Sequence, residues 1–126
     1  MKRILVTGAT SGIGRATALR LAGADTEIII TGRRLDRLEA LRKEVEAKGA
    51  QCRVLNFDVR SEKECIENLE PLGRVDILVN NAGISLVSML CDTTVDDWDR
   101  VMDINLKGVF LCSKEAIKNM VHNKWG

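Results

Sequence analysis

Three glycines stand close together near the start of the sequence, in the stretch TGATSGIGRA at residues 7–16. Gly8, Gly12 and Gly14 lie between a short apolar run and a longer run of helical character. A turn without side chains lets a ligand approach the main chain, and the N-terminus of the next helix offers N–H groups and a positive dipole end to an anion. The pattern predicts a loop that binds phosphate. The alternative is a glycine turn without any ligand, which is frequent between a strand and a helix.

The elements that must position this loop follow from the alternation of short apolar runs with longer amphipathic ones. The short runs predict strands at residues 3–7, 27–31, 51–57 and 75–80. Helical spacing of apolar residues predicts helices at 13–22 and 35–48 and another around 109–120. Ser61 and Glu64 form a capping-box pattern that opens a helix ending before Pro71, and Thr94 caps a further one.

The order of these elements predicts the fold class. Strands that alternate with helices form βαβ units, and strands that are apolar throughout belong to a parallel sheet covered on both faces. Right-handed crossovers then give an α/β, doubly wound, Rossmann-like sheet with the strand order 3-2-1-4. We expect residues 1–126 to form one such domain, incomplete at its C-terminus, with its ligand at the carboxyl ends of strands 1 and 4.

Composition bounds the function. The 19 basic and 18 acidic side chains give a net charge of +1, so nothing indicates a nucleic-acid or membrane partner. No run reaches the ~18 apolar residues of a membrane span, and the first apolar run is too short for a signal peptide. The four cysteines contain no CxxC pair, so we expect reduced core residues and no metal site. These features favour a cytoplasmic protein.

Five motifs occur in the order and near-spacing of one family: TGATSGIG at 7–14, TGRR at 31–34, DV at 58–59, NNAG at 80–83 and the asparagine of MDINLKG at 105. The chain resembles the short-chain dehydrogenases/reductases over nearly its whole length. The resemblance implies a nicotinamide dinucleotide cofactor and hydride transfer between the nicotinamide and a carbonyl or alcohol carbon of a small substrate.

The resemblance also implies roles for individual residues. It assigns the pyrophosphate and ribose to Gly8, Ser11, Gly12, Ile13 and Gly14. Asp58 is expected to accept a hydrogen bond from the adenine amino group, with Val59 alongside.

Further matches follow the fourth strand. Asn81, Ala82 and Gly83 are expected to border the adenosine, while Asn80 ties the strand to its neighbours. Asn105 matches the catalytic-site asparagine of the family, which helps hold a water in a proton relay.

The end of the second strand indicates which nucleotide is bound. Proteins that select NAD usually carry an acidic residue there, which accepts hydrogen bonds from the ribose hydroxyls. This chain has Gly32, Arg33 and Arg34 instead. A guanidinium binds a 2′-phosphate through charge-assisted hydrogen bonds, so we predict NADP(H) rather than NAD(H), with Arg33 favoured over Arg34. The alternative is that the arginines only solvate the start of a helix.

The catalytic groups of the family are not all present. The resemblance implies a serine, a general acid/base tyrosine and a lysine four residues after it, and this sequence contains no tyrosine. We therefore expect the cofactor-binding part of a reductase, truncated before that serine and tyrosine and inactive alone. The alternative is a non-catalytic dinucleotide-binding module or cofactor sensor. We also expect self-association or a homo-oligomer, because the fourth strand has an unpaired apolar edge, and we expect Trp98 to pack its helix onto the body.

Overall fold

A parallel sheet forms the centre of the structure, a computed structural model that describes residues 1–126. Its strands are β1 (Lys2–Val6), β2 (Thr26–Gly32), β3 (Gln51–Asn56) and β4 (Ile77–Val79). They lie in the order β3-β2-β1-β4, with all neighbours parallel. The predicted α/β fold with strand order 3-2-1-4 is confirmed.

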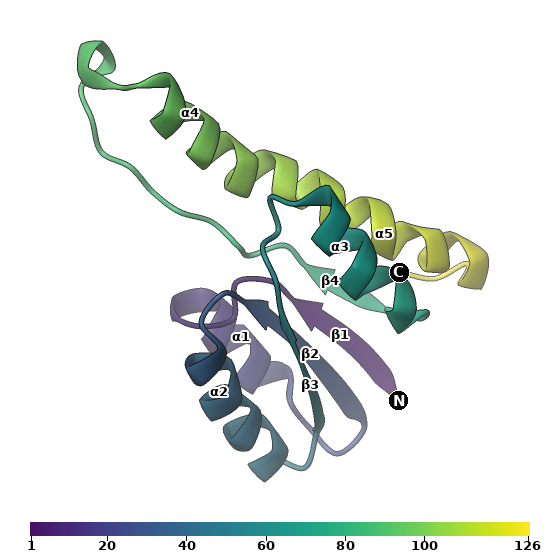
Figure 1. Cartoon of the computed structure of the whole chain (residues 1–126). Helices are drawn as coiled ribbons and strands as arrows, with labels where there is room; N and C mark the ends of the chain where they lie inside the picture. Colours follow the sequence, from purple (N-terminus) through teal and green to yellow (C-terminus); the bar gives the residue numbers. More distant parts are fainter.

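Helices cover both faces of this sheet (Figure 1). The helices α1 (Gly12–Leu21) and α2 (Leu35–Ala47) lie on one face, and α3 (Glu62–Leu69) and α5 (Gly108–Asn123) lie on the other. The Ser61 hydroxyl caps α3 by accepting a hydrogen bond from the backbone N–H of Glu64, as the sequence pattern predicts.

Alternate residues of the central strands supply two separate cores. Ile28 and Ile30 of β2 pack in one apolar cluster with Leu38 and Leu41 of α2. Ile29, between them in sequence, belongs instead to a second cluster, whose other members include Cys65, Leu69, Leu111 and Cys112. Because successive strand side chains point to opposite faces, a continuous apolar run serves both layers at once.

The last third of the chain departs from this compact arrangement. After β4 the chain runs through an extended segment and a short 3₁₀ turn, η2 (Leu90–Asp92), into α4 (Val95–Met102). A π-helical segment, η3 (Asp103–Lys107), joins α4 to α5, so the three form one rod whose α4 end projects from the body (Figure 1). None of the α4 residues is buried, and Trp98 is 60% exposed. The expectation that Trp98 packs onto the body is wrong.

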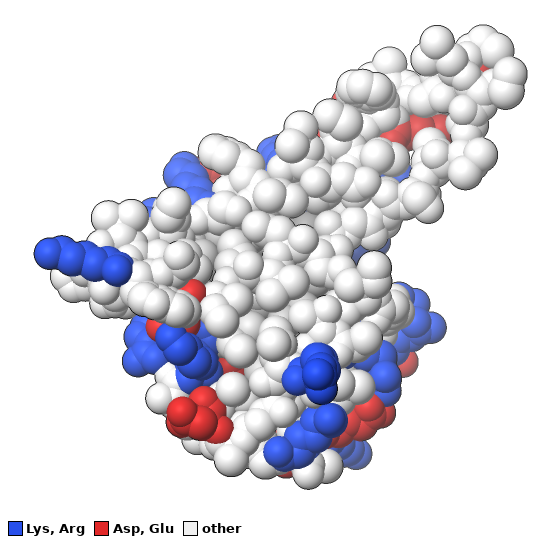
Figure 2. Space-filling view, turned by 180° about the vertical axis from the view of Figure 1, so that it is seen from behind, with Lys and Arg blue, Asp and Glu red and all other residues white.

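The extended segment after β4 and the α4 end of the rod together form a projecting arm. Its surface is largely uncharged on the side that Figure 2 shows. Its exposed apolar side chains are Val87, Met89, Leu90, Val95, Trp98, Leu106 and Phe110. At the other end of the rod, a second short 3₁₀ turn, η1 (Glu70–Leu72), links α3 to the segment before β4. The chain then ends beside its beginning, because the Lys2 ammonium lies 3.3 Å from the centre of the Trp125 ring.

No helix of the structure is both long enough and apolar enough to cross a membrane.

Candidate cofactor site

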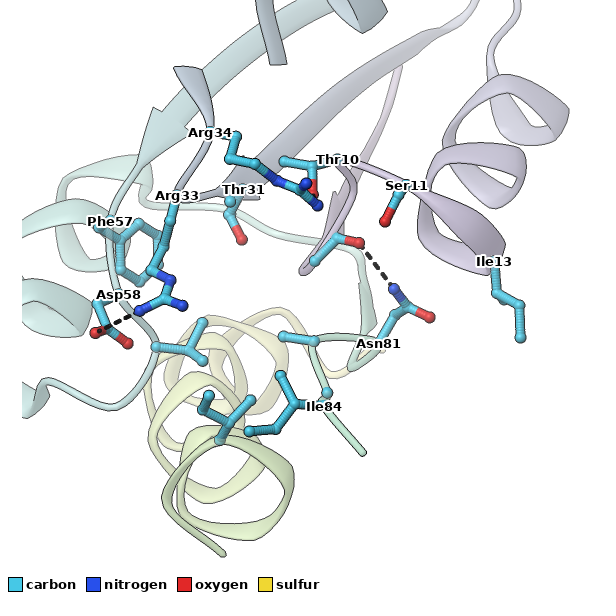
Figure 3. A pocket seen from close by; sticks show the side chains of 16 residues that line it. Thr10, Ser11, Ile13, Thr31, Arg33, Arg34, Phe57, Asp58, Asn81 and Ile84 are labelled. Carbon is cyan, nitrogen blue, oxygen red and sulfur yellow. Dashed lines mark hydrogen bonds and ion pairs between the residues drawn. The ribbon is translucent and has the colours of Figure 1, made fainter. Parts of the chain in front are cut away.

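A cavity of about 690 Å³ opens at the carboxyl ends of the strands, where the strand order reverses between β1 and β4. This is the position at which open α/β sheets bind their ligands. Its walls come from the glycine-rich loop, the end of β2, the end of β3 and the segment after β4 (Figure 3). The lining residues are Gly8, Thr10, Ser11, Ile13, Thr31, Gly32, Arg33, Arg34, Phe57, Asp58, Val59, Asn81, Ala82, Gly83, Ile84 and Ile104.

The glycine-rich loop packs too closely for side chains at two of its positions. Gly8 has a φ of +65°, and a Cβ there would lie 2.6 Å from the Cα of Ala82. Gly14 is buried in α1, and a Cβ there would overlap the Asn81 side chain and the Gly8 carbonyl oxygen. Gly12 has a φ of +59° with open space around it. Gly8 and Gly14 therefore allow the loop to pack against the end of β4, and Gly12 allows its turn.

Hydrogen bonds tie this loop to the chain that follows β4. The Thr7 hydroxyl accepts from the backbone N–H groups of Asn81 and Ala82, each at 3.0 Å. The Asn81 amide in turn donates to the carbonyl oxygens of Thr7 and Gly8, at 3.1 and 3.0 Å, and Figure 3 marks one of these bonds. Asn80 donates instead to the Ser113 hydroxyl on α5. The residue that ties β4 to β1 is thus Asn81, and Asn80 ties it to the helix layer.

The start of α1 leaves its first amide groups without an internal partner. Ser11 occupies the N-cap position, but its side chain makes no capping hydrogen bond. Ile13, in the first turn, is 78% exposed beside the cavity. Unpaired N–H groups and the positive end of a helix dipole attract an anion at this position.

Asp58 forms a charged cluster with Arg33 and Arg60, and Figure 3 shows its Asp58 and Arg33 members on the wall opposite Ser11 and Ile13. The Arg60 guanidinium donates to both carboxylate oxygens of Asp58, at distances of 2.7 to 3.1 Å. Arg33 approaches only to 3.8 Å, with its Nη1 facing Oδ2. The hydrogen bonds from the Arg60 side chain hold the pKa of Asp58 below its usual range, although partial burial opposes them. Asp58 is therefore an anion that is hydrogen-bonded to Arg60 and forms only a longer ion pair with Arg33.

The end of β2 directs further polar groups toward the cavity. The Arg34 guanidinium donates to the Thr10 hydroxyl at 3.3 Å, so the two arginines of the TGRR motif point to different parts of the wall (Figure 3). The Thr31 hydroxyl lies between them, fully buried and without a hydrogen-bond partner in the chain. A buried polar group without a partner is uncommon in folded proteins and calls for a ligand or water.

Asn105 lies in the π-helical segment η3 and pairs with the backbone of one loop residue. Its side-chain oxygen accepts from the Ile84 N–H and its amide donates to the Ile84 carbonyl, both at 2.8 Å. A Cβ on Gly83 would lie 3.3 Å from the same side-chain oxygen. Asn105 thus anchors the loop after β4 next to the cavity, and π-helical turns of this kind are frequent at functional sites.

The structure places most of the predicted cofactor residues around one cavity. Gly12, Gly14 and Asn105 do not line it; Gly14 lies behind the loop, and Asn105 reaches it only through Ile84. Sequence reasoning missed Thr7, Thr31 and Arg60. Arg60 had a local signal, because an arginine two residues after an aspartate in a turn can reach back to its carboxylate.

Comparison with known proteins agrees with this geometry. The family model described as short chain dehydrogenase matches residues 2–126. A 3-oxoacyl-(acyl-carrier-protein) reductase FabG of Aquifex aeolicus is 36% identical over 127 residues, which cover 97% of this chain and 51% of the relative. The chain thus spans about half the length of such curated relatives.

Solved structures superpose on nearly the whole chain. An NAD⁺-bound xylitol dehydrogenase has a TM-score of 0.93 and 36% identity, over 99% of this chain and 50% of its own. A metagenomic short-chain oxidoreductase in complex with NADP has a TM-score of 0.94 and 28% identity, over 99% of this chain and 59% of its own. With the fold, the glycine-rich loop and the family match in agreement, the chain belongs to the short-chain dehydrogenase/reductase family of oxidoreductases.

Proposed function

We propose that this chain binds NADP(H) in the cavity beside the glycine-rich loop, as the cofactor-binding part of an oxidoreductase that acts on a small carbonyl or alcohol. The observation that carries the choice of cofactor is the end of β2. There, Arg33 and Arg34 line the cavity, and neither the strand end nor the next residue supplies a carboxylate for ribose hydroxyls. Guanidinium groups in this position suit a 2′-phosphate.

The residues present fit such a group. Gly12 has open space around it and Ser11 does not cap the helix, so the main chain at the start of α1 is open to a diphosphate. The buried Thr31 hydroxyl lacks a partner and faces the same cavity. Asp58, kept ionised by Arg60, can accept a hydrogen bond from an amino group.

In this proposal the bound cofactor supplies the hydride, and the chain's own residues bind and orient it. The α1 amides would hold the diphosphate and Arg33 and Arg34 would hold the 2′-phosphate, while Asn105 fixes the loop after β4 through the Ile84 backbone. The sequence contains no tyrosine. We therefore propose that the 126-residue chain does not complete the proton transfer by itself.

Calorimetric titration of the purified chain with NADPH and NADH tests the cofactor assignment. We expect tighter binding of NADPH. Arg33→Ala should weaken NADPH binding by about 10- to 100-fold, the value of charge-assisted hydrogen bonds, and NADH binding by less than about 3-fold. Arg42→Ala is the matched control, because Arg42 lies on α2 and pairs only with Glu39 and Glu46. Equal losses for both nucleotides in Arg33→Ala would contradict the assignment.

A second candidate function is a non-catalytic dinucleotide-binding module or cofactor sensor, favoured by the absence of tyrosine. Both candidates predict NADPH binding without turnover by residues 1–126, so the coding region after Gly126 separates them. A serine-bearing strand followed by Tyr-x-x-x-Lys there would support the oxidoreductase, and a stop codon would support the module. We place either function in the cytoplasm and expect the chain to form homo-oligomers.

A further inference from the structure

Arg60 bonds closely to Asp58 beside the cavity, and in the function proposed so far it only keeps that carboxylate ionised. It follows Asp58 by two residues at the end of β3, and its side chain is about one-third exposed. Its backbone N–H donates to Asp58 Oδ1 at 3.0 Å. Its side chain donates to Oδ2 twice, from Nη2 at 2.7 Å and from Nε at 3.0 Å.

These contacts determine whether the Asp58 carboxylate has a free lone pair for Arg33. A carboxylate has about four lone-pair sites, two on each oxygen. The Arg60 side chain donates to Oδ2 from Nη2 and from Nε, whose hydrogen it shares with Oδ1, and Oδ2 is the oxygen that Arg33 faces. Arg33 stays at 3.8 Å, beyond hydrogen-bond distance, and its side chain remains 60% exposed.

We propose that Arg60 is a positioning residue for cofactor selectivity: by donating to Asp58 Oδ2 from two nitrogens, it keeps the Arg33 guanidinium free for the 2′-phosphate. Without the Arg60 fork, Oδ2 loses both side-chain donors and keeps no backbone partner. Arg33 can then close the remaining gap and form a hydrogen-bonded ion pair. A 2′-phosphate would have to break that pair before it binds, whereas a nucleotide without this phosphate would not. The inference rests on the proposed NADP(H) site.

The variant Arg60→Met removes the donors and keeps the length of the side chain. We expect the ratio of Kd for NADH to Kd for NADPH to fall by about 2- to 5-fold, the equivalent of one exposed ion pair. The matched control is Arg74→Met. Arg74 makes the same fork on Asp76, two residues away, at the opposite end of the sheet. It should leave the ratio unchanged.

A double-mutant cycle with Asp58→Asn separates positioning from bulk charge. Asparagine is neutral and gives Arg33 no ion-pair partner, so Arg60→Met in that background should leave the ratio unchanged. If Arg60 acted only through its positive charge, the ratio would fall equally in both backgrounds. The ratio is insensitive to the adenine contact of Asp58, because both nucleotides contain adenine. The same titrations with adenosine 2′,5′-bisphosphate and 5′-AMP remove any contribution from the nicotinamide.

The outcomes are distinct. An unchanged ratio in Arg60→Met, with native circular dichroism, overturns the positioning role. An equal fall in both backgrounds also overturns it. If the unmodified chain binds NADPH no more tightly than NADH, the proposed cofactor assignment fails instead. A lower ratio in Arg60→Met that disappears in the Asp58→Asn background supports the proposal.

Discussion

The glycine at position 8 gives the sharpest test of the loop geometry. Its φ of +65° disfavours any residue with a Cβ, at a cost of about 1–2 kcal/mol. In Gly8→Ala the new Cβ would also lie 2.6 Å from the Cα and 2.9 Å from the N of Ala82, and backbone atoms cannot rotate away. Overpacking of this kind costs about 1–3 kcal/mol. We expect Gly8→Ala to lower the free energy of unfolding by about 2–5 kcal/mol.

Two other glycines separate these contributions. Gly12→Ala has the same backbone cost, at φ +59°, but meets no atom within 4 Å, so we expect a loss of only about 1–2 kcal/mol. Gly23→Ala meets nothing and lies outside the left-handed region, so it should be neutral or stabilise by up to about 1 kcal/mol.

Urea unfolding followed by circular dichroism measures the series. Trimethylamine N-oxide in every sample keeps the weakest variant measurable, because it favours the folded state. The expected order of stability is Gly23→Ala, then Gly12→Ala, then Gly8→Ala. Equal losses in Gly8→Ala and Gly12→Ala would refute the close contact between the loop and Ala82, and with it the packing of the phosphate-binding turn.

The remaining predictions concern acid stability and association. Arg60 and Arg74 lower the pKa of Asp58 and Asp76 below the ordinary 3.8, so both carboxylates stabilise the fold above that pH and lose this contribution as the pH falls below it. The urea concentration at half-unfolding should decrease as the pH is lowered from 5 to 3, and it should decrease less in Asp76→Asn. An equal decrease in the unmodified chain and in Asp76→Asn would contradict the lowered pKa of Asp76. The exposed apolar arm and the unpaired β4 edge predict concentration-dependent association in sedimentation, reduced in Phe110→Glu. A sharp monomer with a cooperative melting transition would exclude it.

The sheet was predictable because its strands are short, apolar runs separated by helices with clear end signals. Ile28, Ile29 and Ile30 predict a strand buried on both faces, and all three are fully buried. The fourth strand is shorter than its apolar run predicts. Residues 75–80 are apolar enough to predict a strand, but only Ile77–Val79 form one, the three residues that pair with Ile4–Val6 of β1.

The site was predictable where it depends on the main chain and not where it depends on distant pairs. Glycine spacing located the loop, since backbone conformation is encoded locally. The contact between Thr7 and Asn81 joins residues 74 positions apart, so no local pattern indicates it. The sequence of α4 likewise does not predict that the helix projects from the body, since Thr94 and Asp97 indicate only where it begins.

The π-helical turn at η3 sets the rotational phase of the rod. The N–H of Gly108 donates to the carbonyl of Asp103, five residues earlier, in place of the usual four. Each residue of an ordinary helix advances by about 100°. Deleting one residue between 103 and 107 would restore an ordinary α-helix and would rotate α5 about its axis by roughly that angle. Leu111 and Cys112 would turn away from the sheet. The π-helical turn therefore allows one rod to bind the Ile84 backbone through Asn105 and to pack Leu111 and Cys112 in the core.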